Sequence, residues 1–191
     1  MITVDLQRRI DLGILEKSLA WMAEKRNNLY EYYDKVVERT VFDKQIDLID
    51  RLKHKPENFL TEANIVYLVP VDAANTGLPD ASVDYNISNT VLEHIPKKDI
   101  EQILKEGRRI LKDDRIAIHF IDLSDHFQHQ DSSITKINFL RYSDENWEKI
   151  AGIQLAYCNR LRRVITLPYS RRLVLMCCAW KFCWIRMRWK A

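Results

Sequence analysis

Short apolar runs that alternate with amphipathic stretches most restrict what this chain can fold into. Ile65–Val69, Val83–Ser88 and Ile116–Ile121 each have the length and composition of a buried strand. Before the last of these runs, apolar residues recur at the spacing of one helix face, at Ile100, Ile103, Leu104, Ile110 and Leu111. Strands that alternate with helices in this way predict an α/β fold with a parallel sheet covered by helices.

The first third of the chain adds one strand and further helices to this plan. Ile2–Leu6 has the character of a buried strand that ends in an acid. Ile10–Lys25 carries apolar residues at the spacing of an amphipathic helix, and residues 27–60 predict a helical insertion. No apolar run reaches the ~20 residues of a membrane-spanning helix, and no signal peptide is recognisable. We therefore expect a cytoplasmic protein.

Charge divides the chain into two unequal parts. All 27 acidic residues lie at or before Glu148, whereas the segment from Arg160 to Ala191 holds nine Lys or Arg residues and no acid. The same segment contains three of the four cysteines and three of the five tryptophans. Without it the remaining chain has a net charge of about −6, which is ordinary for a cytosolic domain. The basic segment therefore needs an explanation of its own.

The middle of the chain carries the most specific pattern. Asp72-Ala73 is followed by a turn at Leu78–Asp80, then by the strand Ser82–Ser88, and then by Asn89–Ile95, which contains Leu-Glu-His-Ile. This order resembles a class I S-adenosylmethionine-dependent methyltransferase of type 11, with a resemblance that runs from about Ile2 to Arg162. It implies a Rossmann-like, doubly wound and mostly parallel sheet with helices on both faces.

The resemblance also implies how the cofactor S-adenosylmethionine would be held. In open α/β sheets, ligands bind at the carboxyl ends of the strands. Asp5, with its neighbour Leu6, matches the acid that binds the ribose hydroxyls. Asp72 would accept a hydrogen bond from the adenine amino group, while the Ala73 backbone N–H would contact the ring. Asn89 and Thr90 would line the space near the methyl donor. Any of these acids could otherwise be a solvated residue at a strand end or turn.

A polar loop follows the last predicted strand, from Asp122 to Asp131, and contains His126 and His129. These two histidines and the nearby acids have the residue types of a zinc site. A loop that faces the methyl acceptor, or a plain surface loop, would have the same composition. We expect His126 and His129 to face the substrate and expect no metal site. His94 lies between Leu-Glu and Ile-Pro and fits a capping or packing role.

One expected element is missing from the chain. The family places a glycine-rich loop after its first strand, where the backbone approaches the methionine half of the cofactor. The four glycines, Gly13, Gly77, Gly107 and Gly152, are too far apart to form such a loop. The expectation is a partial domain over residues 1–162 that lacks the first strand and the glycine loop.

The basic segment from 163 to 191 suggests a change of reading frame. Residues 163–176 can be encoded so that a shifted frame reads Ser-Asp-Tyr-Leu-Ala-Leu-Phe-Glu-Glu-Ala-Gly-Phe-Asp. That peptide is a capped amphipathic helix ending at glycine, and it resembles the family's penultimate segment. A frameshift after about residue 162 would explain the loss of acids and the excess of Trp and Cys. We expect such a tail to be non-native, poorly ordered or opportunistically docked.

Two functions follow from these observations. The first is a methyltransferase-like fragment with impaired or no activity and with weak or absent cofactor binding. The methyl acceptor of its intact relatives would be a small molecule or lipid-like. No residue is a convincing general base, so none is assigned as catalytic, and no nucleic acid is expected as a partner. The alternative is a non-enzymatic α/β binding protein whose basic tail contacts a membrane surface or nucleic acid.

Overall fold

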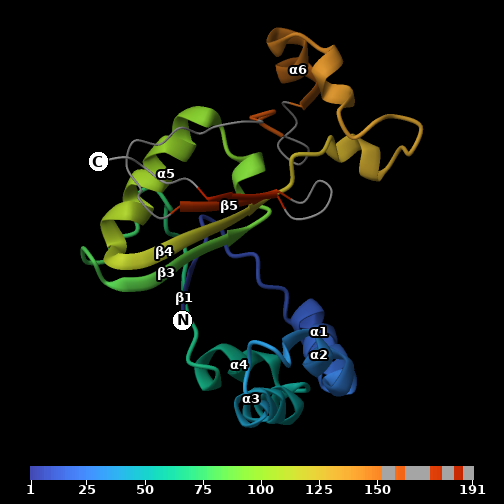
Figure 1. Cartoon of the computed structure of the whole chain (residues 1–191). Helices are drawn as coiled ribbons and strands as arrows, with labels where there is room; N and C mark the ends of the chain where they lie inside the picture. Colours follow the sequence, from blue (N-terminus) through green and yellow to red (C-terminus); the bar gives the residue numbers. More distant parts are fainter. Residues whose placement is uncertain (152–157, 162–172, 178–182, 187–191) are drawn as a thin grey trace. The chain divides into compact units, whose positions relative to one another are not determined.

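The computed structural model describes residues 1–151, 158–161, 173–177 and 183–186. The chain divides into two compact units, Met1–Asp72 and Ala73–Ala191. Each unit is an α/β structure with its own sheet (Figure 1).

In the first unit, two parallel strands are separated along the chain by four helices. β1 pairs with β2 in the register Ile2↔Val66, Thr3↔Tyr67 and Val4↔Leu68. The chain between these strands is helical for most of its length, and its four helices gather together (Figure 1). The elements are β1 (Ile2–Val4), α1 (Leu12–Glu24), α2 (Arg26–Tyr33), α3 (Arg39–Leu52), α4 (Pro56–Glu62) and β2 (Val66–Leu68).

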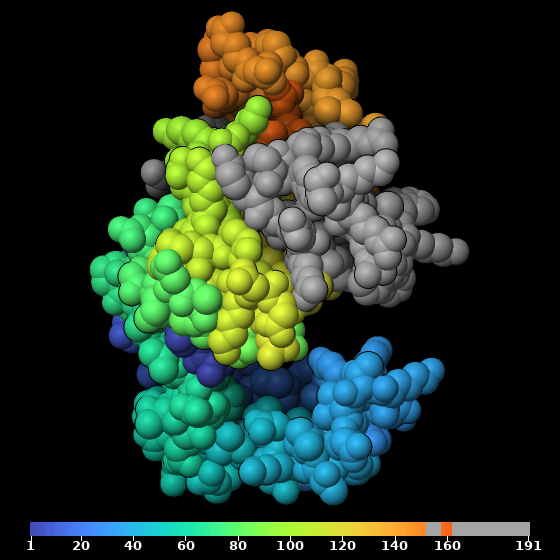
Figure 2. Space-filling model, turned by 60° about the vertical axis from the view of Figure 1, so that its left-hand side comes forward, coloured from blue at the N-terminus to red at the C-terminus, as the bar shows by residue number. Residues whose placement is uncertain are grey.

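The helices of the first unit enclose a small core. α1 begins where the Asp11 side chain accepts a hydrogen bond from Ile14 N at 2.9 Å, which satisfies one of the free N–H groups of a helix start. Leu19 of α1 is buried, as are Phe42 and Ile46 of α3. At the edge of this core the Arg26 guanidinium joins α2 to Asp43 and Asp47 of α3. In the space-filling view these helices, in blue and cyan, form a continuous surface (Figure 2).

The second unit contains a four-stranded sheet in the order β3-β4-β5-β6. β3, β4 and β5 run parallel to one another, and β6 is antiparallel to β5. The described elements are β3 (Val83–Asn89), the 3₁₀ turn η1 (Leu92–His94), α5 (Lys97–Ile110), β4 (Leu111–Ile121), the 3₁₀ turns η2 (His126–His129) and η3 (Asn138–Arg141), α6 (Asp144–Ala151), β5 (Leu173–Cys177) and β6 (Cys183–Arg186).

α5 covers one face of β3 and β4 (Figure 1). A cluster of buried apolar residues joins the helix to the sheet and to η1, and consists of Leu92, Ile100, Leu104, Leu111, Ala117 and Ile121. Gly107 allows the close approach, because a Cβ built on it would lie 2.3 Å from Asn86 Nδ2. A second buried cluster in the same unit contains Phe139, Trp147, Ala151 and Cys158.

The predicted α/β architecture with parallel pairing is confirmed. The strands predicted at Ile65–Val69 and Val83–Ser88 are β2 and β3, and the helix predicted over Ile10–Lys25 is α1. The predicted start of β4 was wrong: this strand begins at Leu111, directly after α5 ends at Ile110, and not at Ile116. Within the described residues, β1–β2 and β3–β6 form separate sheets.

The basic segment contributes β5 and β6 to the second sheet. The expectation of a poorly ordered or opportunistically docked tail otherwise falls on residues 163–172, 178–182 and 187–191, which lie outside the described residues. Among the parts that are described, no helix has both the length and the apolar character to cross a membrane.

Candidate functional site

In the first unit, Asp5 directly follows β1, and Asp72 lies four residues after the end of β2. The Asp5 N–H donates to Leu68 O at 3.1 Å, and the Asp5 carbonyl accepts from Val71 N at 2.9 Å. These bonds continue the pairing of β1 and β2 up to the residue before Asp72. The Tyr67 hydroxyl donates to Asp5 Oδ2 at 3.2 Å, so the carboxylate is oriented from β2. Leu6 is 66% exposed.

The second unit presents Asn89 and Thr90 at the carboxyl end of β3. Both residues are exposed. The Thr90 N–H donates to Phe120 O at 2.9 Å, and its hydroxyl donates to the Asn89 carbonyl at 2.9 Å. Thr90 has a φ of 50°, a left-handed conformation that is unfavourable for a β-branched residue. Such strain is concentrated at functional sites, and it marks the point where the chain leaves β3.

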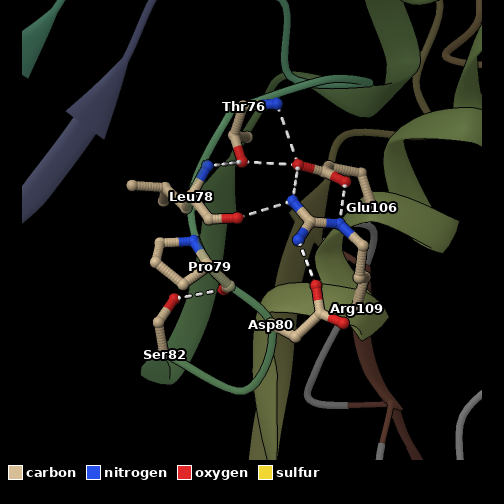
Figure 3. Close-up of polar contacts among 7 residues, drawn as sticks. All are labelled: Thr76, Leu78, Pro79, Asp80, Ser82, Glu106 and Arg109. Carbon is tan, nitrogen blue, oxygen red and sulfur yellow. Dashed lines mark hydrogen bonds and ion pairs between the residues drawn. The ribbon is translucent and has the colours of Figure 1, made fainter.

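An ion pair between the buried Glu106 and the half-buried Arg109 fixes the Leu-Pro-Asp turn that precedes β3 (Figure 3). Glu106 and Arg109 both belong to α5, and the Arg109 guanidinium donates two hydrogen bonds to the Glu106 carboxylate, each of 2.7 Å. The Thr76 N–H donates to Glu106 Oε1 at 2.8 Å, and Arg109 Nη2 donates to Leu78 O at 2.7 Å. Arg109 also pairs with Asp80. The turn after Ala73 is therefore anchored to a helix.

The charges of this network stabilise one another. Hydrogen bonds from Arg109, and then from Thr76, lower the pKa of Glu106 from 4.5 to about 2, although burial opposes the shift. The pKa of Arg109 is raised above its ordinary value, chiefly by the bonds to Glu106 and Asp80. Both groups are therefore ionised at every pH near neutrality. Sequence analysis missed this pair, and its only local sign was an acid and a base three residues apart on a helix.

Titratable residues gather at the carboxyl ends of β3 and β4. η1 contributes Glu93 and His94, Asp122 follows β4, and η2 contributes His126 and His129. The ring centroid of His126 lies 4.8 Å from that of His94 and 5.1 Å from that of His129. The two histidines expected to face the substrate therefore stack on each other. His94, expected to cap or pack, joins them at the same ring cluster.

Within this cluster, the surroundings favour the neutral imidazole of His126 and the charged carboxylate of Asp122. Burial lowers the pKa of His126, and the proximity of His94 lowers it further. Although burial opposes ionisation of Asp122, hydrogen bonds from Ser124 hold the pKa of its carboxyl below the usual value. Asp122 Oδ2 lies 3.7 Å from both His126 Nε2 and His129 Nε2. One carboxylate thus faces two imidazole rings.

A buried histidine in the middle of β4 is a further residue that sequence reasoning missed. His119 is 2% exposed, and its Nδ1 lies 2.7 Å from Ser88 Oγ of β3. Burial lowers the pKa of His119 to about 4, so the ring is neutral at physiological pH. The hydrogen bond to Ser88 joins two neighbouring strands and gives His119 a structural role. The only sign of this residue in the sequence was a histidine within an otherwise apolar predicted strand.

The residues present suit one half of S-adenosylmethionine better than the other. The carboxylates at the ends of β1 and β2 have the acceptor oxygens that ribose hydroxyls and an adenine amino group require. The methionine half needs a glycine-rich loop whose backbone can approach it closely. Gly13 lies in α1, Gly107 packs on Asn86, and Gly77 meets no atom within 4 Å of a Cβ built on it. None of these described glycines provides that cradle.

The predicted cofactor residues divide between the two units. Asp5, Leu6 and Asp72 belong to the first unit. Ala73, Asn89 and Thr90 belong to the second unit. Asp5 and Leu6 follow β1, Asp72 follows β2, Asn89 ends β3 and Thr90 follows it, whereas Ala73 precedes β3. The carboxyl ends of parallel strands form the edge at which α/β proteins bind nucleotides and carry out group transfer.

Parallel strands, crossover helices and polar residues at the carboxyl strand ends are compatible with a partial Rossmann-like α/β fold. A family model described as a methyltransferase domain matches residues 15–118, more than half of the chain. The chain therefore belongs to this methyltransferase family, as the resemblance at Asp72–Ile95 predicts. Comparisons with curated proteins and with solved structures give no significant match.

Proposed function

We propose that this chain is an S-adenosylmethionine-dependent methyltransferase-like protein that retains the adenosine half of the cofactor site and has impaired or no activity. Asp5 and Leu6 would contact the ribose, and Asp72 and Ala73 the adenine. Asn89 and Thr90 would lie toward the methyl group. In its active relatives the cofactor supplies the methyl group, which is transferred by in-line displacement, and the protein contributes mainly by positioning the reactants.

The observation that carries this proposal is the pairing of Asp5 with the end of β2. The Asp5 carbonyl accepts from Val71, one residue before Asp72, and the Tyr67 hydroxyl orients the Asp5 carboxylate. Two acids at adjacent strand ends suit the two polar parts of an adenosine. The anchored turn from Thr76 to Asp80 supports the same assignment, because it holds the chain directly after Ala73.

Impaired activity is proposed because the glycines that the structure describes, Gly13, Gly77 and Gly107, offer no cradle for the methionine half. Without it, binding energy is lost at the end of the cofactor that carries the reactive sulfonium, and positioning of the methyl group suffers first. The histidines His126 and His129 would face a small-molecule or lipid-like acceptor. For the architecture, we propose a doubly wound, partial Rossmann-like domain over residues 1–162, with residues 27–60 as a helical insertion.

The adenosine assignment can be tested with 5′-methylthioadenosine, which lacks the amino-acid half. Perturbation of amide NMR signals should centre on residues next to Asp5 and Asp72. Asp5→Asn and Asp72→Asn should each weaken binding about tenfold or more, because an amide replaces one acceptor oxygen of a charged hydrogen bond by a donor. Asp34→Asn is the matched control on the exposed end of α2 and should bind like the wild type. Equal binding by all three variants would refute the assignment.

The tail from 163 to 191 is proposed to come from a shifted reading frame. A second candidate function takes the tail as functional, since the nine cations from Arg160 to Ala191, a segment that holds no acid, favour an anionic partner. A non-enzymatic protein of this kind would bind anionic vesicles or nucleic acid in a salt-sensitive way. It would show no preference for adenosine compounds, so the same titrations distinguish the two candidates.

A further inference from the structure

Three ligand atoms of different side chains meet where β3 and β4 end. Glu93 and His94 of η1 and His126 of η2 each offer one such atom, and these atoms lie within 4.8 Å of one another. Glu93 is 1% exposed, His126 is half-buried and His94 is exposed. The cluster therefore has a buried floor and an open side through which an ion could enter.

Two atoms of this cluster are buried without a hydrogen-bond partner among the described residues. Glu93 Oε1 accepts from Asp122 N at 3.0 Å, but Glu93 Oε2 has no donor. His126 Nε2 is also unsatisfied, and its nearest acid is Asp122 at 3.7 Å. A buried carboxylate oxygen or ring nitrogen left unpaired is unfavourable, because it has lost its contact with water and gained no partner in return. A bound cation would satisfy both atoms at once.

We propose that Glu93, His94 and His126 form a Zn²⁺ site, with the Asp122 carboxylate beside it. This inference goes beyond the methyltransferase assignment and does not depend on it. It also differs from the sequence-based expectation of no metal site, because the local pattern at His126 and His129 does not reveal that Glu93 and His94 join them.

The donor set selects the metal. Two imidazoles and one carboxylate suit zinc, which binds nitrogen and oxygen ligands at about 2.0–2.2 Å in a tetrahedron. Magnesium and calcium prefer all-oxygen sites. Ligand atoms of such a tetrahedron lie about 3.3 Å apart, so ligand atoms that now lie within 4.8 Å of one another need to close in by up to about 1.5 Å. The fourth position would hold water or an oxygen of Asp122.

The backbone around the ligands is already held in place. Asn159 Nδ2 donates to Leu92 O at 2.6 Å and to Ile95 O at 2.8 Å, and its N–H donates to Glu93 O at 2.8 Å. On the other side, the Asp125 side chain caps η2 by accepting from Phe127 N at 2.9 Å. Fixed supporting bonds of this kind orient metal ligands. Zinc would tie the segment after β3 to the segment after β4.

Zinc binding can be measured on the full chain without a histidine tag, after chelator treatment. Titration with Zn²⁺ against a chromophoric chelator should give one equivalent per chain, with a dissociation constant of micromolar or lower. His94→Gln and His126→Gln should each weaken binding at least tenfold. His54→Gln is the matched control, because His54 is an exposed histidine of the first unit that contacts Glu16. Its affinity should equal that of the wild type.

The cysteines require a separate control, since thiolates also bind zinc. A variant with Cys177, Cys178 and Cys183 changed to Ser should keep the stoichiometric site. Co²⁺ substitution should give a visible spectrum without thiolate charge transfer. Because His94 is exposed, His94→Gln should retain the circular dichroism of the wild type. No stoichiometric binding, binding unchanged in His94→Gln, or loss of the site with the cysteines would each overturn the proposal.

Discussion

Replacing Glu106 by Gln removes the charge at the centre of the network that anchors the turn before β3. The carboxylate accepts hydrogen bonds from the Thr76 N–H, the Thr76 hydroxyl and two nitrogens of Arg109. Gln is close in size but is neutral, and its amide NH₂ would face one of these donors. Arg109 would then lose its charged partner on α5 and at least one of its two hydrogen bonds to residue 106, while it keeps Asp80 and the Leu78 carbonyl as partners.

The size of the effect follows from the pKa of the carboxyl. A pKa of about 2 in place of 4.5 corresponds to about 3 kcal/mol of stabilisation of the charged form. The Arg109 side chain is 36% exposed, so solvent screening reduces the loss for Glu106→Gln to about 2 kcal/mol. Because the pKa is lowered on folding, this contribution is complete above pH 4.5. It is lost as the pH falls from 4.5 toward 2.

Urea unfolding followed by circular dichroism measures this loss, and hydrogen exchange localises it. The Thr76 amide should exchange faster in Glu106→Gln than in the wild type. Glu101→Gln, on the exposed side of the same helix, is the matched control and should cost less than about 0.5 kcal/mol. If Glu106→Gln costs no more than this control at pH 7, the ion pair does not anchor the turn. The same conclusion follows if the difference persists at pH 2.

Three further predictions concern packing, protonation and the reading frame. Gly107→Ala should cost about 1–3 kcal/mol, because the added Cβ would lie 2.3 Å from Asn86 Nδ2; unchanged stability in urea would contradict this contact. His119 should titrate near pH 4 by NMR, and its contribution to stability should be complete above pH 6.5 and lost as the pH falls toward 4; a pKa near 6.5 would contradict its burial. Nucleotide sequencing after the Arg162 codon should read Ser-Asp-Tyr-Leu and then Phe-Glu-Glu-Ala-Gly-Phe in the shifted frame; any other reading refutes the frameshift.

The sequence was sufficient to predict the elements whose apolar pattern is strong. β3 and α1 lie within one or two residues of the predicted strand and helix. The start of β4 was missed because Lys112–Arg115 is charged and has the composition of a turn. In the structure Asp84 of β3 pairs with Lys112 and Arg115, at 3.0 Å and 3.1 Å. Cross-strand ion pairs let charged residues continue a strand, which a periodicity argument cannot detect.

The candidate site could be predicted in part from the sequence. Strand-end acids such as Asp5 and Asp72 can be found by counting from a predicted strand, because the carboxyl edge is set by the fold class. The gathering of Glu93 with His126 could not be found in this way. It depends on contacts between residues distant in sequence: the Asp122 N–H donates to Glu93 Oε1, and Asn159 donates to the carbonyls of Leu92 and Glu93 in η1. The left-handed Thr90 is likewise a property of the folded backbone alone.

The central claim is that the chain retains the adenosine half of a methyltransferase cofactor site without a cradle for the methionine half. Calorimetric titration of the 191-residue chain with S-adenosylmethionine and with 5′-methylthioadenosine tests it directly. The amino-acid half should add nothing, so both ligands should bind with similar dissociation constants, above about 100 μM, and Asp5→Asn should weaken both. A low-micromolar constant for S-adenosylmethionine, or binding at least tenfold tighter than that of 5′-methylthioadenosine, would contradict the account.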